Sequence, residues 1–107
     1  MAERREHEMV TLVAAAAQAM RGIEPVAGKV DAAQLSTVRK ALEAMVAGHA
    51  RPGGLEGLSA DEVAQIEGRM VALHERAAAI AIALGETGPA DRWLADAERF
   101  ASDDAQR

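Results

Sequence analysis

The stretch from Ser59 to Leu84 carries a nearly uninterrupted helical repeat of apolar residues, and it constrains the fold more than any other feature. Its members follow one another in steps of three and four: Val63, Ile66, Met70, Leu73, Ala77, Ile80 and Leu84. Such spacing places them along one face of a long α-helix. The rest of the chain must supply surfaces that cover this face.

The composition predicts a single all-α domain over residues 1–107. With one Trp, one Phe and no Tyr, the core must be built from aliphatic side chains that are tolerated in helices. Runs of β-branched and aromatic residues, which favour strands, are missing. The absence of cysteine excludes disulfides, thiolate metal sites and cysteine nucleophiles.

Start and stop signals predict a small helical bundle of three main antiparallel helices, with a short C-terminal fourth helix packed across or beside them. The helices are expected at about 2–21, 32–47, 60–84 and 89–101. A flexible Gly- and Pro-rich loop is expected over 48–58, and a frayed tail over 102–107.

Two of these helices carry the same start signal. Asp31 is followed three residues later by Gln34, and Ser59 is followed in the same way by Glu62. This is the spacing of a capping box, in which each of the two side chains accepts a hydrogen bond from the backbone of the other residue. The second and third helices are therefore expected to begin directly after Asp31 and Ser59.

Two segments are apolar on nearly every face and are expected to be buried on more than one side. They are the second half of the first helix, 10–20, and the second half of the long helix after Arg76, where Ile82 lies opposite the main apolar face. In an up-down-up bundle the two helices run parallel, so we expect these halves to lie level and to approach closely. Either the first and fourth helices cover the long helix, or a second copy of the protein does.

The long helix carries two charged or titratable residues beside its apolar face. On a heptad that starts at Val63, Glu67 and His74 fall on the flank, which predicts solvated side chains. Their separation, about 10 Å along the helix axis, is too large for a direct acid–base pair. The serines also lack the His and Asp partners of a nucleophile. We expect no catalytic residue and no cofactor.

The other two histidines define an alternative site for a metal or a small ligand. Glu3 and His7 lie four residues apart on the first helix, and His49 lies just past the second helix. In an antiparallel hairpin these three side chains could converge. His74 lies about 13 Å further along the bundle than His7 and is not expected to join them.

A candidate partner interface consists of large apolar residues on the last two helices: Val71, Ile82, Trp93, Leu94 and Phe100. Trp93 and Phe100 fill the core in one interpretation and anchor a partner in the other.

Charge and hydropathy exclude two classes of partner. A formal charge of −5 argues against general nucleic-acid binding, because phosphate contacts require a basic face. The uncharged run over 9–20 is too short to span a bilayer, and the acidic segment before it argues against a secretory signal. We therefore expect no membrane association.

These observations predict a non-catalytic helical protein–protein interaction module that acts as an adaptor, a regulatory subunit or an assembly component. Self-association as a homodimer is expected. The excess of Arg over Lys indicates a bacterium with a GC-rich genome, and the absence of cysteine fits a reducing cytoplasm. A metal- or small-ligand-binding helical bundle is the alternative.

Overall fold

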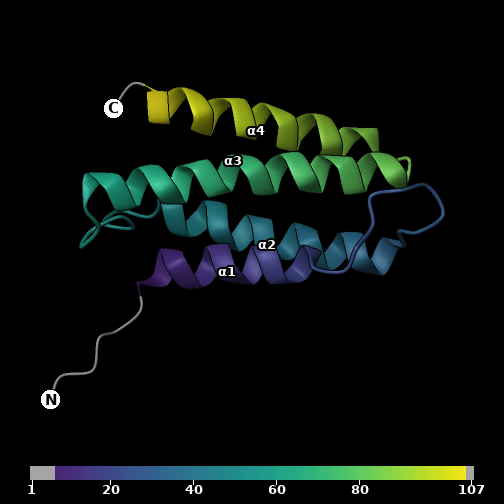
Figure 1. Ribbon diagram of the computed structural model, residues 1–107, viewed down its shortest axis with the longest axis horizontal. Coiled ribbons are helices and arrows are strands. Elements are labelled where there is room, and N and C mark those ends of the chain that lie inside the picture. The colour runs from purple at the N-terminus through teal and green to yellow at the C-terminus, as the bar shows by residue number, and fades with distance from the viewer. Residues whose placement is uncertain (1–6, 106–107) are drawn as a thin grey trace, which may run out of the picture.

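A computed structural model describes residues 7–105, which fold as α-helices without any strand in that range. The helices are α1 (Glu8–Met20), α2 (Ala32–Ala50), α3 (Ala60–Ala83) and α4 (Thr87–Ala105). Successive helices run in opposite directions, so that α1 is parallel to α3, and α2 is parallel to α4 (Figure 1). The prediction of an all-α fold is confirmed, while residues 2–6 of the expected first helix lie outside the described range.

Both capping boxes form as the sequence predicts. Asp31 accepts a hydrogen bond from the backbone N–H of Gln34 at 2.7 Å, and the Gln34 side chain accepts one from the N–H of Asp31 at 2.9 Å. Ser59 and Glu62 make the same reciprocal pair at 3.1 and 2.8 Å. Local hydrogen bonding therefore sets where α2 and α3 begin.

The prediction that the fourth helix is short is wrong. α4 has 19 residues, as many as α2 and more than the 13 of α1. It continues through the residues expected to fray as far as Ala105, and residues 106–107 lie outside the described range. Burial explains its length, because one regular stripe of the helix is covered along most of its course and tertiary packing supplies most helical stability. The stripe consists of Ala90, Trp93, Ala97 and Phe100.

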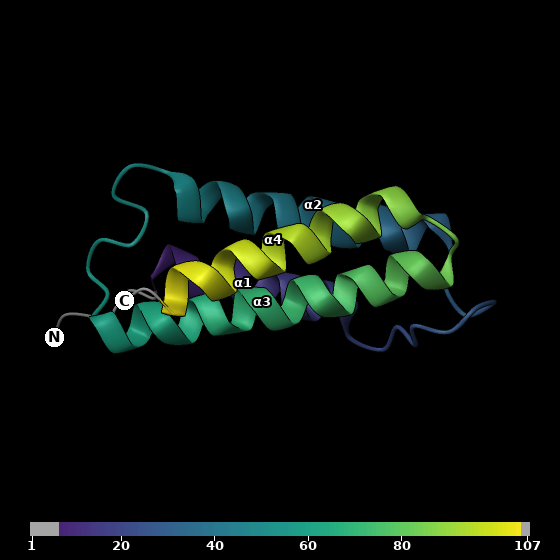
Figure 2. The same ribbon diagram turned by 90° about the horizontal axis from the view of Figure 1, so that it is seen from above.

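The helices form two antiparallel hairpins rather than a closed bundle. α3 and α4 pack most closely, α1 packs on α2, and the two hairpins meet where α3 contacts α1 and α2. Over the described residues, α4 makes no close backbone contact with α1 or α2. The molecule is flat, with extents of 49 × 34 × 19 Å (Figures 1 and 2).

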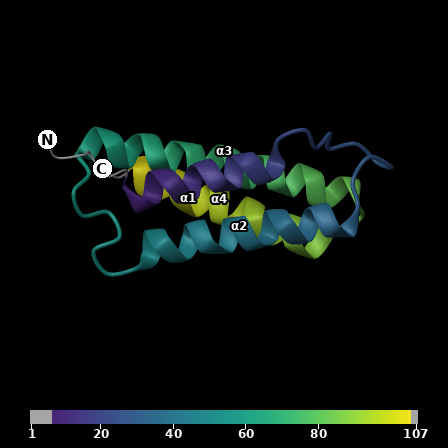
Figure 3. The same cartoon turned by 90° about the horizontal axis from the view of Figure 1, so that it is seen from below.

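The second half of α3 lies beyond the reach of α1. The Arg76 guanidinium donates to the carbonyl of Ile23 at 3.2 Å, which places the turn after α1 beside Arg76, in the last third of α3. α1 stops there because it has 13 residues against 24 in α3 (Figure 3). The expectation that the two apolar halves lie level is therefore wrong. Ala77 and Ala81 are instead buried in a core that includes Trp93 of α4.

α1 buries one stripe of side chains, although its sequence is apolar on nearly every face. The stripe consists of Met9, Val13, Ala16 and Met20. The intervening Ala14, Ala15 and Ala17 are exposed, so the expectation of burial on several sides is wrong. A methyl side chain has little apolar area, and its exposure to water therefore costs little free energy.

Replacing Gly68 by Ala is expected to stabilise the protein. Gly68 lies inside α3, is exposed, and has no heavy atom within 4 Å of the position a Cβ would take. Alanine lowers the conformational entropy of the unfolded chain, which should raise the free energy of unfolding by about 0.5–1 kcal/mol. The matched control is Gly54→Ala, whose Cβ would meet the Gly48 carbonyl oxygen and should destabilise. Chemical denaturation of both variants checks this, and an unchanged or lowered stability of Gly68→Ala contradicts it.

Candidate functional site

A buried polar flank on α3 is the first element of the site. Glu67 and His74 are both 0% exposed, so the expectation of solvated side chains is wrong. α3 contacts α1 and α2 as well as α4, and its buried arc is therefore wider than one heptad seam. Ala81, one heptad beyond His74, is buried on the same flank. A carboxylate and an imidazole at such positions require polar partners inside the protein.

His49 of α2 is one partner of the buried Glu67. Its Nε2 donates to Oε2 of Glu67 at 2.9 Å, and the His49 side chain keeps 15% of its surface exposed. This bond joins α2 to α3 across the place where the two hairpins meet. It explains how a carboxylate is accommodated in an otherwise aliphatic core.

Phe100 of α4 contacts both histidines. Its ring centroid lies 5.2 Å from that of His49, in an edge-on arrangement, and 5.6 Å from that of His74. The Phe100 side chain is buried. One aromatic ring from α4 thus packs against polar rings from α2 and α3, and these contacts fix the positions of both imidazoles.

His74 has one ring nitrogen without a hydrogen-bond partner among the described residues. Its Nδ1–H donates to the Met70 carbonyl, one turn earlier in α3, at 2.7 Å. Since a carbonyl can only accept, the proton is on Nδ1, and Nε2 carries a buried lone pair with no donor. Burial lowers the pKa of His74 below its ordinary value of 6.5, outweighing the Met70 carbonyl and the Asp96 carboxylate, which raise the pKa. The imidazole is therefore neutral at neutral pH.

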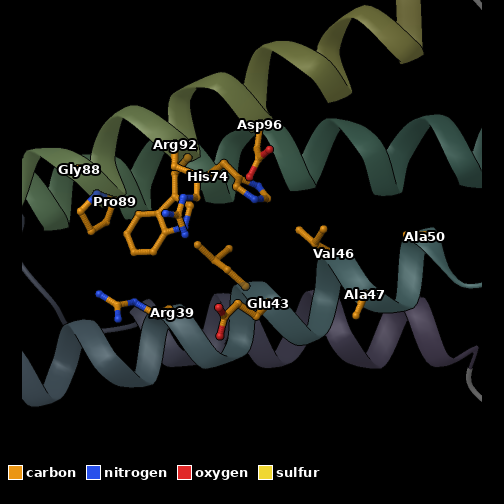
Figure 4. Close-up of a pocket in the computed structure, with 12 residues that line it drawn as sticks. Arg39, Glu43, Val46, Ala47, Ala50, His74, Gly88, Pro89, Arg92 and Asp96 are labelled. Carbon is orange, nitrogen blue, oxygen red and sulfur yellow. The ribbon is translucent and has the colours of Figure 1, made fainter.

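A groove of about 530 Å³ lies between α2 and α4, and His74 is at its wall beside Asp96 (Figure 4). α2 supplies one wall with residues that recur at helical spacing: Arg39, Leu42, Glu43, Val46, Ala47 and Ala50. α4 supplies the other wall with Gly88, Pro89, Arg92, Trp93 and Asp96. The groove thus has an apolar floor, a charged rim at one end and small side chains at the other end.

The charges on the rim are matched with like charges across the groove. Along the groove Arg39 of α2 lies level with Arg92 of α4, and one turn further Glu43 lies level with Asp96 (Figure 4). The side chains of Arg39 and Glu43 are not directed at their counterparts on α4. Asp96 also pairs within α4 with Arg99, at 3.6 Å. Like charges repel, so these residues give α2 and α4 no reason to close on each other. The rim is basic at the Pro89 end and acidic one turn away.

The residues of the predicted metal or ligand site have other partners. Glu3 lies outside the described residues. His7 caps α1, because its Nδ1 accepts from the Met9 N–H at 3.0 Å, and its Nε2 donates to the carbonyl of Glu56 at 2.8 Å. His49 is bonded to Glu67 and lies within α2 rather than past its end. Among the described side chains, no three His, Asp or Glu residues gather as a metal site requires.

The residues of the predicted interface divide between the core and the surface. Trp93 and Phe100 are 5% and 2% exposed and belong to the core. Ile82 and Leu94 are 56% and 42% exposed, and Val71 is half-buried. Val71 and Leu94 line a separate shallow groove of about 300 Å³ between α3 and α4, which we call the outer face. No helix in the described part of the chain has the length and apolar content needed to cross a bilayer.

Truncating His49 is expected to destabilise the protein through Glu67. His49→Ala removes a donor from a buried carboxylate and should lower the free energy of unfolding by about 1–3 kcal/mol. The same truncation in a Glu67→Gln background should cost less, because the neutral amide needs the donor less. A double-mutant cycle by chemical denaturation measures this coupling, and additive effects within about 0.5 kcal/mol would contradict it.

Acidification is expected to destabilise the protein through His74. The unfolded chain takes up a proton on this residue near pH 6.5, whereas burial lowers the pKa in the folded chain. Stability is therefore present above the unfolded pKa and falls below it, by at most about 1.4 kcal/mol per pH unit for this residue. His74→Gln cannot titrate and should lose that part of the dependence. Denaturation at about pH 7.5 and about pH 5.5 checks this, and equal slopes for both proteins would refute it.

Comparison of the chain with protein-family models, with curated proteins and with solved structures finds no match. The function of the protein is therefore inferred from the geometry of the groove and of His49 and His74 beside it.

Proposed function

We propose that this protein is a non-catalytic helical interaction module that binds an amphipathic helix of a protein partner in the groove between α2 and α4. The observation that carries the proposal is the open side of the fold, where two parallel helices line a groove. Their backbones make no close contact over the described residues, and Phe100 of α4 reaches across to pack edge-on against His49 of α2. A helix of the partner could pack in this groove against both α2 and α4, as amphipathic helices do in other helix-binding grooves. A setting in the bacterial cytoplasm is part of the proposal, and the absence of cysteine fits it.

The walls of the groove have the properties that helix recognition uses. Val46 is half-buried and exposes part of its apolar side chain, while the buried Leu42 and Trp93 form the floor beneath it. Ala47 and Ala50 leave room for a neighbouring backbone to approach. The charged rim would set the direction of the bound helix, because charges beside an apolar contact select partner and orientation. None of these groups is arranged as a nucleophile with a base.

A second candidate function is the binding of a small apolar molecule in the same groove. His74 is among the lining residues, and a molecule with an O–H or N–H group that displaced the cover of its buried Nε2 would supply the missing donor. Metal binding at His7 and His49 is less favoured, because a metal would have to displace the hydrogen bonds that both rings make. Native mass spectrometry separates the candidates, since a bound small molecule would add its mass to the chain.

A designed peptide tests the proposed function. The probe is a fluorescein-labelled amphipathic helix with an Asp and an Arg four residues apart beside its apolar stripe, measured by anisotropy at submicromolar protein. Val46→Glu places a charge in the groove and should weaken binding at least tenfold, or about 1.4 kcal/mol. Leu94→Glu, on the outer face, is the matched control and should leave binding unchanged.

The single Trp provides a second signal in the same titration, because Trp93 lines the groove. Its emission should change when the peptide binds to the wild-type protein. A peptide that does not bind, or that binds both variants equally, would refute the proposed function.

A further inference from the structure

We infer that the helix which fills the groove is α4 of a second copy of this chain, lying antiparallel about a two-fold axis. The inference rests on the proposed function of the groove and adds the identity and direction of its partner.

The order of charges along the rim carries the inference. An incoming helix meets Arg39 and Arg92 at the Pro89 end and Glu43 and Asp96 one turn later. It must therefore present an acidic side chain first and a basic one about four residues further along the groove. When α4 runs in the reverse direction it presents Asp96 first and Arg92 second. The second copy would thus bring a carboxylate to the two guanidiniums and a guanidinium to the two carboxylates.

The same charges determine the direction of packing. A parallel α4 would place its Arg92 against Arg39 and Arg92, and its Asp96 against Glu43 and Asp96. Such like-charge contacts are repulsive and select against this arrangement. The antiparallel arrangement is two-fold symmetric, since each copy gives its α4 to the groove of the other. An isologous contact of this kind closes at the dimer.

The position of α4 in the fold suits this exchange. Over the described residues, α4 makes close backbone contact with α3 alone, so it stands at the edge of the molecule (Figure 1). α2 is held by both α1 and α3. An edge helix can lie in a neighbour's groove while its own buried stripe stays packed on α3. Ala47 and Ala50 of α2 limit the steric barrier to its approach.

His74 lies at the place where the polar group would arrive, although its Nε2 is buried and a donor would reach it only after the covering side chains moved. Its Nε2 has a lone pair and no donor, and its ring lies beside Asp96 at the wall of the groove (Figure 4). In the antiparallel arrangement Arg92 of the second copy is directed to Asp96 and Glu43. A guanidinium carries five N–H donors and accepts none, so it supplies the kind of group that Nε2 lacks.

Two complementary variants of the full chain test the inference. The first, Arg39→Glu with Arg92→Glu, makes the rim entirely acidic, and the second, Glu43→Lys with Asp96→Lys, makes it entirely basic. Light scattering of the wild-type protein at micromolar concentration should give twice the monomer mass of 11.2 kDa. For each variant alone, the dissociation constant of the dimer should rise more than tenfold, so that the variant is a monomer at the concentration where the wild-type protein is a dimer. An equimolar mixture should recover the dimer, because every contact in it joins opposite charges.

The mixture also controls for folding, since variants that fail to fold cannot recover a dimer together. Circular dichroism of each variant verifies its helix content. Glu75→Lys with Glu98→Lys, on the outer face, is the matched charge control and should leave the wild-type mass unchanged.

Three outcomes would overturn the inference. They are a wild-type monomer at micromolar concentration, a mixture that does not dimerise, and a dimer that is lost on Leu94→Glu but not in the two rim variants. The last outcome would place self-association on the outer face. If the designed peptide still binds the groove in any of these cases, the proposed function stands and the partner is a different helix. If the peptide also fails to bind, both proposals fall.

Discussion

The packing of α4 on one flank of α3 is the contact on which the remaining structure depends. α4 contributes Ala90, Trp93, Ala97 and Phe100 from a single stripe, and the small residues among them let the two helices approach closely. Phe100 of this stripe packs against the fully buried His74, and Glu67, on the same flank of α3, is buried as well. Polar groups must then be satisfied inside the protein, and the His49–Glu67 bond meets part of this requirement by joining the second hairpin to the first. The buried flank of α3 thus carries the polar link between the hairpins.

The groove follows from the same arrangement. α4 has one buried stripe, which packs mainly on α3, and Phe100 of that stripe also contacts His49 of α2. The backbones of α2 and α4 nevertheless make no close contact over the described residues. The charged residues that lie level with each other on α2 and α4 at the Pro89 end have equal sign, so they cannot form ion pairs across the groove. The fold is therefore open on the side where a closed four-helix bundle would have its fourth contact. The shape of the groove and the charges on its rim both suit the binding of a further helix between α2 and α4. The proposed interaction rests on these two properties.

Sequence reasoning recovered the features that depend on neighbouring residues. The all-α class, the starts of α2 and α3 at Asp31 and Ser59, and the apolar face of α3 follow from local hydrogen bonds and spacing. It failed for Glu67 and His74, because heptad positions describe one contact face and α3 has neighbours on more than one side. The walls of the groove left a weak signal, Arg39 before Glu43 and Arg92 before Asp96. Only the parallel alignment of α2 and α4 makes these two pairs correspond.

The sequence by itself determined where helices begin and which side chains repeat along them, because capping and helical periodicity act within a few residues. The tertiary structure decided how far α4 extends, which flank of α3 is buried, and that Nε2 of His74 lacks a hydrogen-bond donor. Those properties depend on the helices that become neighbours in space. The stretch from Ser59 to Leu84 shows the difference, since its apolar face follows from its own spacing, while the burial of Glu67 and His74 follows from the helices that surround α3.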